Sequence, residues 1–454
     1  MTPPDAPAGA ITVESVRDVV RSLMPDLITD LCALVEIPSC AFAGFPREPV
    51  QEAAELTRRL FAESGAQAEL QSIEGGEPAV VARIGAGPRH VVLYSHYDVQ
   101  PAGSEDAWLS PAFEPTVRDG RLYGRGSADD KSGIAMHLGA IRVLRQILGE
   151  VPLRVTALIE GEEECGGPLP EYVLEHPELV DADAMIVADV GNRSLGEPTL
   201  VTALRGVVDA TVEVRTLPRP AHSGMYGGPA PDALLALIRI LDTLRDEAGD
   251  TRIVAGYDWN GAPADEAQYR SDLGLAPDAL LLGTGPLADR LVTRPAVNVI
   301  GLDAPPVEGA INAVIPWARA KVSLRIPPAT DPQQALDALC GHLSAGAPWG
   351  VEVTVIPGET ARGCAITTDG PAYDAARWAL EAAYGRPSVE AGEGGSIPLI
   401  ASILQVAPRT EVLLLGAEDP GAHIHAPNES VDLAELESMV VAEALFLLRL
   451  AGVV

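Results

Sequence analysis

The stretch HVVLYSHYDVQP, residues 90–101, joins a strand to side chains that can carry chemistry. Its first six residues are an apolar run that predicts a buried strand, and His96 follows at the carboxyl end. Ligands of open α/β sheets bind at that edge. His96 and Asp98 are two positions apart, so in an extended chain their side chains point to the same side. The pair suits a metal ligand with an orienting carboxylate, and the alternative is a surface histidine near a turn.

Strands and helices alternate on both sides of this stretch. Apolar runs predict further buried strands over residues 79–84, 153–160, 184–189 and 411–416. Helical periodicity predicts helices over residues 13–38 (with a break at Pro25), 48–64, 132–148, 371–384 and 432–450. Alternation of this kind predicts an α/β fold with a mostly parallel sheet flanked by helices.

The pattern changes in the middle of the chain. Residues 202–217 alternate apolar with polar side chains, which predicts an antiparallel strand pair. After it come expected strands at 297–302, 318–326 and 351–356, helices at 230–246 and 332–346, and a polar, loop-rich segment at 247–292. The simplest organisation is an α/β domain formed by residues 1–203 and 364–454. A smaller α+β domain, residues 204–363, is inserted into it.

Composition excludes several classes of protein. Among 454 residues, 64 acidic side chains outnumber 32 basic ones, and a net charge of −32 disfavours binding to nucleic acid. No apolar run reaches the roughly 18 residues that a membrane span needs. Five cysteines without a CxxC pair favour a reducing compartment over a disulfide framework. The amino-terminal residues lack the features of a signal peptide, so a cytoplasmic protein is expected.

Acidic residues follow two other expected elements. In LYGRGSADDKSG (122–133), Asp129 replaces the third glycine of a dinucleotide loop, and with Asp130 it precedes a helix. The two acids could equally cap that helix. In ALIEGEEECGG (157–167), four acids cluster directly after a strand. They repel one another unless a cation is present, and the alternative is a solvated acidic turn.

Two more segments complete the pattern. Asp189 ends an expected strand, and the loop GAEDPGAHIHAPNES (416–430) carries His423 and His425 after another. Each segment alone is a weak signal. Together they place histidine and carboxylate side chains at the carboxyl ends of parallel strands, a donor set that suits Zn²⁺, Mn²⁺ or Co²⁺.

With these segments identified, the chain resembles the M20 family of co-catalytic metallopeptidases, on its carnosinase-like dipeptidase branch. The matching stretches occur in the family's order: SHYDVQP, LYGRGSADDKSG, IEGEEECGG, the strand ending at Asp189, AHSGMYGG, EGGSIP and GAHIHAPNE. They extend from residue 95 to residue 429. The family's inserted lid and dimerisation domain corresponds to residues 204–363, and the remaining residues to its catalytic, metal-binding domain.

The resemblance implies a site for two divalent metal ions, Zn²⁺ first, with Mn²⁺ or Co²⁺ as alternatives. The implied ligands are His96, Asp129, Glu164, Asp189 and His425, with Asp129 bridging both ions. Asp98 is expected to orient His96, and the Asp129–Asp130 peptide is expected to be cis. His423 is the alternative last ligand, but the family's spacing of a histidine, two residues and Asn-Glu favours His425.

Further roles follow from the same resemblance. Aligning the acidic run on its flanking glycines makes Glu163 the general base. His222 is expected to stabilise the oxyanion in the active site of the partner subunit, which implies a homodimer through the lid domain. Arg325 is expected to bind the substrate carboxylate. Asn298 and Ser396 are weaker candidates for contact with the substrate.

The implied reaction is hydrolysis of the amide bond of dipeptides or short peptides by a metal-bridging water that Glu163 activates. Within the fold, the alternatives are an N-acyl-amino-acid deacylase of the acetylornithine or succinyl-diaminopimelate type, or a specialised biosynthetic amidohydrolase. A non-catalytic peptide-binding relative is the alternative outside enzymes. A serine or cysteine nucleophile is disfavoured, because no GxSxG motif is present and Cys165 adjoins the acidic run.

Overall fold

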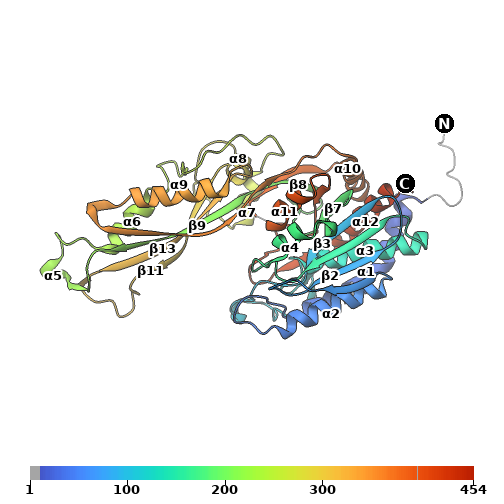
Figure 1. Ribbon diagram of the computed structural model, residues 1–454, viewed down its shortest axis with the longest axis horizontal. Helices are drawn as coiled ribbons and strands as arrows, with labels where there is room; N and C mark the ends of the chain where they lie inside the picture. Colours follow the sequence, from blue (N-terminus) through green and yellow to red (C-terminus); the bar gives the residue numbers. More distant parts are fainter. Residues whose placement is uncertain (1–10, 396) are drawn as a thin grey trace. The chain divides into compact units, whose positions relative to one another are not determined.

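The computed structural model describes residues 11–395 and 397–454, which form two compact units (Figure 1). Unit 1 contains the described residues up to Thr202, together with Ile366–Ala391 and Leu399–Val454. Unit 2 contains Ala203–Ala365 and Gly392–Pro398. The segment Gly392–Pro398 was expected in the α/β domain of residues 1–203 and 364–454, but it groups with unit 2. The assignment of the units as catalytic and lid domains stays a prediction.

A nine-stranded sheet has the order β1-β2-β6-β3-β7-β17-β8-β15, with β16 also paired to β8. The strands are β1 (Gln67–Gln71), β2 (Ala79–Ile84), β3 (His90–His96), β6 (Arg154–Glu160), β7 (Ala184–Val187), β8 (Thr199–Leu204), β15 (Cys364–Ala365), β16 (Val389–Glu393) and β17 (Glu411–Leu414). The central strands β6, β3, β7 and β17 run parallel, whereas β2 is antiparallel to β1 and β6, and β8 is antiparallel to β17 and β15. The predicted α/β fold with a mostly parallel sheet is therefore confirmed.

The helices of unit 1 are α1 (Val13–Val35), α2 (Glu48–Glu63), α3 (Lys131–Leu148), α4 (Leu169–Glu175), α10 (Pro371–Tyr384), α11 (Pro398–Val406) and α12 (Leu433–Leu450). Helices α1, α3, α10 and α12 pack on one another, and their apolar faces share one core with the sheet (Figure 1). The expected break at Pro25 is absent, since α1 continues through it. Pro25 is exposed, so water can reach the carbonyl group that loses its N–H donor.

A small three-stranded sheet supports the loops of unit 1. It has the order β18-β5-β4 and is built from β4 (Thr116–Arg118), β5 (Arg121–Tyr123) and β18 (Ser430–Asp432). Pairing of β18 with β5 brings the chain after the histidine-containing loop next to the start of the SADDK segment. Two segments about three hundred residues apart in sequence are thereby held side by side.

Unit 2 is built on an antiparallel sheet of order β11-β13-β9-β14. Its strands are β9 (Gly206–Arg215), β11 (Ala296–Asp303), β13 (Trp317–Ile326) and β14 (Glu352–Ala361), and β10 (Ala221–His222) pairs separately with β12 (Ala313–Val314). Its helices are α5 (Ser223–Tyr226), α6 (Ala233–Asp242), α7 (Glu266–Asp272), α8 (Leu287–Val292) and α9 (Pro332–Ala345). Helices α6 and α9 bury their apolar sides on the sheet (Figure 1).

The expected strand pair at residues 202–217 is wrong. Strands β8 and β9 occupy this stretch, but they belong to different sheets. Only Arg205 separates them, and the shortest common hairpin needs two turn residues. The regular alternation comes from β9, which buries every second side chain, whereas β8 is buried on both faces.

No helix in the described part of the chain combines the length and the apolarity that a membrane span requires.

Candidate active site

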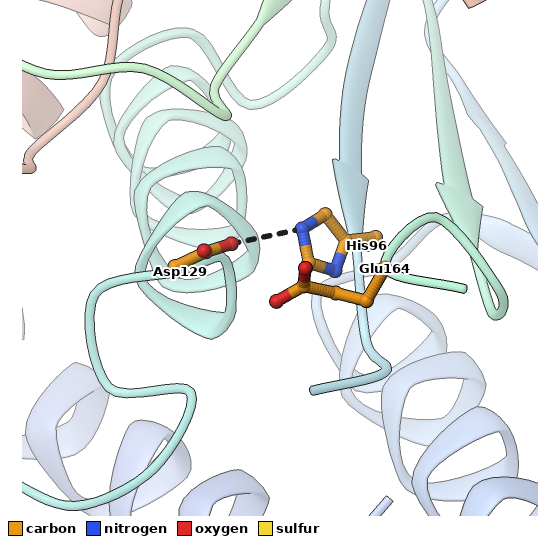
Figure 2. Close-up of side chains that lie close together, drawn as sticks. All are labelled: His96, Asp129 and Glu164. Atoms are coloured by element: carbon orange, nitrogen blue, oxygen red, sulfur yellow. Dashed lines mark hydrogen bonds and ion pairs between the residues drawn. The ribbon is translucent and has the colours of Figure 1, made fainter. Parts of the chain in front are cut away.

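The candidate site lies in unit 1, where the parallel strands end. His96 is the last residue of β3 and pairs in register with Glu160, the last residue of β6. Asp189 follows β7 by two residues, and Asp129 precedes α3. Figure 2 shows the side chains of Asp129 and Glu164 beside the His96 ring. Parallel strands end on the same edge of a sheet, so the alternating strands and helices bring these segments together.

Asp129 lies between two histidines. Its Oδ1 is 3.1 Å from Nε2 of His96, and its Oδ2 is 3.0 Å from Nε2 of His425. Each histidine also faces a second carboxylate: Asp189 Oδ1 lies 3.7 Å from His96, and Glu164 Oε2 lies 3.1 Å from His425. The five residues therefore form two donor groups that share Asp129, which is the arrangement expected of a bridging ligand.

The donor atoms suit divalent cations. Within groups that include His96–Asp129–Glu164 and His96–Asp130–Asp189, the ligand atoms lie within 4.8 Å of one another. Imidazole and carboxylate ligands of this kind fit Zn²⁺ and Mn²⁺. Asp130 is buried, and its Oδ1 has no hydrogen-bond partner among the residues that the structure describes. Several buried carboxylates this close repel one another, so cations at this position would remove a large electrostatic cost.

A third group adds a residue that the sequence analysis did not single out. It combines Glu418 with Asp129 and Asp189. Glu418 follows β17 by four residues, in the loop that also carries His425. Glu418 carries the signal that marked Asp189, an acid after a strand end. In this loop, however, the two histidines were the candidates that the sequence favoured.

Asp98 holds two parts of the site. Its Oδ1 is 3.3 Å from Nδ1 of His96, on the far side of the ring from Asp129. Its two carboxylate oxygens accept hydrogen bonds from the backbone N–H groups of Glu163 and Glu164, both at 3.1 Å. Gln100 donates from its side chain to Oε2 of Glu164 at 2.8 Å. The SHYDVQP segment thus positions both its own histidine and the acidic loop.

The carboxyl group of Glu163 has a raised pKa in the metal-free protein. Burial raises its pKa well above the usual value, and the negative charge of Asp189 raises it further. The neighbouring Cys165 has a pKa raised to about 12, first by burial and then by the charge of Asp98. A thiolate is therefore disfavoured there, in line with the sequence-based expectation.

Glu429 fixes the turn that carries Asp129. Its carboxylate accepts hydrogen bonds from the backbone N–H groups of Gly126, Ala128 and Asp129, each at 3.0 Å. It also pairs with Arg125 at 2.6 Å, inside the protein. The peptide after Asp129 is cis, as expected. Because Glu429 and His425 share one loop, that loop places the histidine and the bridging carboxylate together.

Three other predicted site residues fall in unit 2: His222, Asn298 and Arg325. His222 is exposed, and its Nδ1 accepts a hydrogen bond from the backbone N–H of Gly224 at 3.1 Å. Asn298 on β11 is opposite Ser323 of β13, two residues before Arg325, so Asn298 and Arg325 share one face of the sheet. Ser396 lies outside the described residues. Whether any of these residues contacts substrate stays a prediction.

Comparisons with known proteins bear on the family. The profile of Peptidase family M20/M25/M40 matches residues 92–449. A cysteinylglycine-S-conjugate dipeptidase of Corynebacterium striatum is 41% identical over 367 residues, which cover 79% of this chain and 80% of that protein. A Beta-Ala-His dipeptidase of Rattus norvegicus is 28% identical over 379 residues, covering 78% and 76% of the two chains.

The solved structures agree at the level of the fold. The crystal structure of human carnosine dipeptidase 1 superposes with a TM-score of 0.84 at 22% identity, over 99% of this chain and 100% of that one. The family match covers most of the chain, including every segment that supplies the donor groups. The expected family is confirmed: the chain belongs to peptidase family M20/M25/M40 and is a metal-dependent peptidase of that family.

Proposed function

We propose that this chain is a dipeptidase that hydrolyses the amide bond of free dipeptides, with two divalent metal ions and Glu163 as general base. The observation that carries the proposal is the position of Asp129, whose two carboxylate oxygens face two histidines. In this proposal His96, Asp129 and Asp189 hold one ion, and Asp129, Glu164 and His425 hold the other. Zn²⁺ is the first choice, with Mn²⁺ and Co²⁺ as alternatives.

Bound ions of this kind lower the pKa of water and polarise a carbonyl group. The chain's own residues would then move the proton. Glu163 takes a proton at its carboxylate and later returns it to the leaving amine. Its backbone, fixed by Asp98, keeps the carboxylate beside the donor groups. Binding of cations next to Glu163 also favours its ionised form, the form a general base needs.

His222 is proposed as the donor to the developing oxyanion, in the active site of the partner subunit. Since Nδ1 accepts the Gly224 N–H, the proton of the neutral ring belongs on Nε2, which can donate. Support for a homodimer through unit 2 comes from the edge strand β11, which exposes Val299, Ile300 and Leu302. An exposed apolar edge strand of this kind is typical of a pairing surface.

Arg325 is proposed to bind the carboxylate of the substrate. Burial lowers its pKa, and no ion pair of its side chain is found among the described residues. Arg205 lies near it, and burial, together with the charge of Arg325, lowers the pKa of Arg205 to about 10. Two neighbouring, partly buried guanidinium groups favour an anionic ligand. Asn298 and Ser396 remain proposed contacts of the same substrate.

For the substrate class, we propose cysteinylglycine-type dipeptides, on the strength of the 41% identical relative. We also propose a reducing, cytoplasmic compartment, which the five free cysteines support.

The test is a substrate panel measured with metal-loaded protein, with and without chelator. It holds an S-substituted cysteinylglycine, free cysteinylglycine, β-Ala-His, and N-acetyl- and N-succinyl-amino acids. We expect chelator-sensitive hydrolysis of free dipeptides, fastest for the cysteinylglycine compounds. Hydrolysis of the acyl-amino acids alone would contradict the proposal and identify a deacylase.

A further inference from the structure

Glu418 is a further acid at the metal-binding groups, beyond the three that the proposed two-ion site requires. Its side chain is almost completely buried, with 7% of the residue exposed. A carboxylate oxygen of Glu418 lies in one group with oxygens of Asp129 and Asp189, all within 4.8 Å of one another. Asp129 and Asp189 are proposed, together with His96, to hold one of the two ions.

The backbone fixes Glu418 at this point. Its carbonyl oxygen accepts a hydrogen bond from the N–H of Asn192 at 2.8 Å, and it forms a parallel bridge with Gly191. The two chains approach so closely that a Cβ atom added to Gly191 would lie 2.8 Å from Cβ of Glu418. The loop after β17 is thus locked to the loop after β7, which carries Asp189.

The balance of charge between ions and carboxylates also favours a ligand at this position. Two divalent ions bring four positive charges, and Asp129, Glu164 and Asp189 supply three negative ones. With Glu418, the proposed carboxylate ligands alone would supply four negative charges, which match the charge of the two ions. Without a cation, a buried carboxylate beside two others is strongly disfavoured.

We propose that Glu418 is an additional carboxylate donor to the ion held by His96, Asp129 and Asp189. This inference rests on the proposed two-ion function. One imidazole with three carboxylates is an oxygen-rich ligand set, which suits Mn²⁺ better than a nitrogen- or sulfur-rich set would. Glu418 therefore strengthens binding of that ion and shifts the site toward Mn²⁺.

The test is calorimetric titration of the metal-free protein with Mn²⁺, for wild type and for Glu418→Gln. Asp419→Asn is the matched control. It removes the same charge one residue along the loop, where the carboxylate pairs with Arg121 at 2.8 Å and accepts the Gly421 N–H. We expect Glu418→Gln to weaken binding of one of two ions by at least about tenfold, and Asp419→Asn to bind both as wild type does.

Thermal unfolding in chelator provides a second readout. Metal-free Glu418→Gln should unfold no earlier than metal-free wild type, because the substitution removes a buried repulsion. Two ions bound by Glu418→Gln with wild-type affinity would overturn the inference, even if dipeptide hydrolysis fell, since Glu418 would then act on the substrate. Failure of wild type itself to bind two ions would instead overturn the two-ion function on which the inference rests.

Discussion

Asp98 shows at the scale of one residue how the site is assembled. The carboxylate of Asp98 faces the His96 ring. It also accepts hydrogen bonds from the backbone N–H groups of Glu163 and Glu164. A neighbour that orients a proposed metal ligand and also holds the proposed general base should affect metal binding and turnover together.

Replacing Asp98 by Ala should lower metal affinity about 10- to 100-fold and lower kcat even with saturating metal. The carboxylate that fixes Glu163 would be missing, so added metal alone cannot restore turnover. Metal titration and steady-state kinetics on the same preparation measure both effects. Full recovery of kcat with excess metal would show that Asp98 acts only through His96.

Glu163→Gln should lower kcat by about 10²- to 10⁴-fold, because the amide cannot accept the proton. Both metal ions should remain bound, since Glu163 is not among the proposed ligands. Kinetics combined with elemental analysis provide the measurement. Glu164→Gln is the comparison, and it should lose metal as well as activity. Turnover of Glu163→Gln near the wild-type rate would disprove the general-base assignment.

The residues of the site were predictable to different degrees. An acid or histidine after a buried strand marks His96 and Asp189, because parallel strands end at one edge. The choice between His423 and His425 came from the family's spacing. Both residues have positive φ in the same loop, so neither periodicity nor propensity separates them. Glu418 carries the same signal, an acid after a strand end, but its approach to Asp189 depends on the close contact with Gly191, which the sequence does not reveal.

At the scale of elements, α3 and α12 are joined by a buried ion pair. Nδ1 of His137 lies 2.9 Å from a carboxylate oxygen of Glu443, and Nε2 donates to the carbonyl oxygen of Tyr94 on β3. Burial works to lower the pKa of His137, but the charge of Glu443 and these hydrogen bonds outweigh it, and the net pKa is raised.

This raised pKa predicts how stability depends on pH. The stabilising contribution of His137 is fully present below its unfolded pKa, near 6.5, and is lost as the pH rises through the higher folded value. Glu443→Gln should cost about 3–5 kcal/mol of unfolding free energy below pH 6.5, and less above it. Denaturant unfolding of wild type and variant across this range measures the difference. An equal cost at every pH would contradict the assignment.

The helices and strands could be predicted from the periodicity of apolar residues wherever their burial is regular. The half-buried strands β9 and β13 alternate, and the parallel strands read as apolar runs. The wrong strand pair at 202–217 has a different origin. Local pattern identifies a strand but not its partner, and the chain leaves one sheet for another at a single residue, Arg205.

At the scale of the whole molecule, the proposed dimer predicts that two inactive variants restore activity when their subunits are mixed. In a mixed dimer of Glu163→Gln and His222→Ala chains, one site would combine an intact general base with an intact His222 from the other chain. Random exchange at equal concentrations should therefore restore about a quarter of wild-type activity. The measurement is activity after subunit exchange, with each variant alone as control. No recovery despite demonstrated exchange would contradict the role of His222 across the dimer.

We propose that two ions and their shared carboxylate make this chain a dipeptidase. The most direct measurement is titration of metal-free protein with Mn²⁺ or Zn²⁺ while hydrolysis of a cysteinylglycine substrate and its N-acetyl analogue is followed. We expect activity toward the free dipeptide to rise with metal and to saturate at two ions per chain, while the N-acetyl analogue stays uncleaved. Full activity without bound metal, or cleavage of the acylated compound alone, would contradict it.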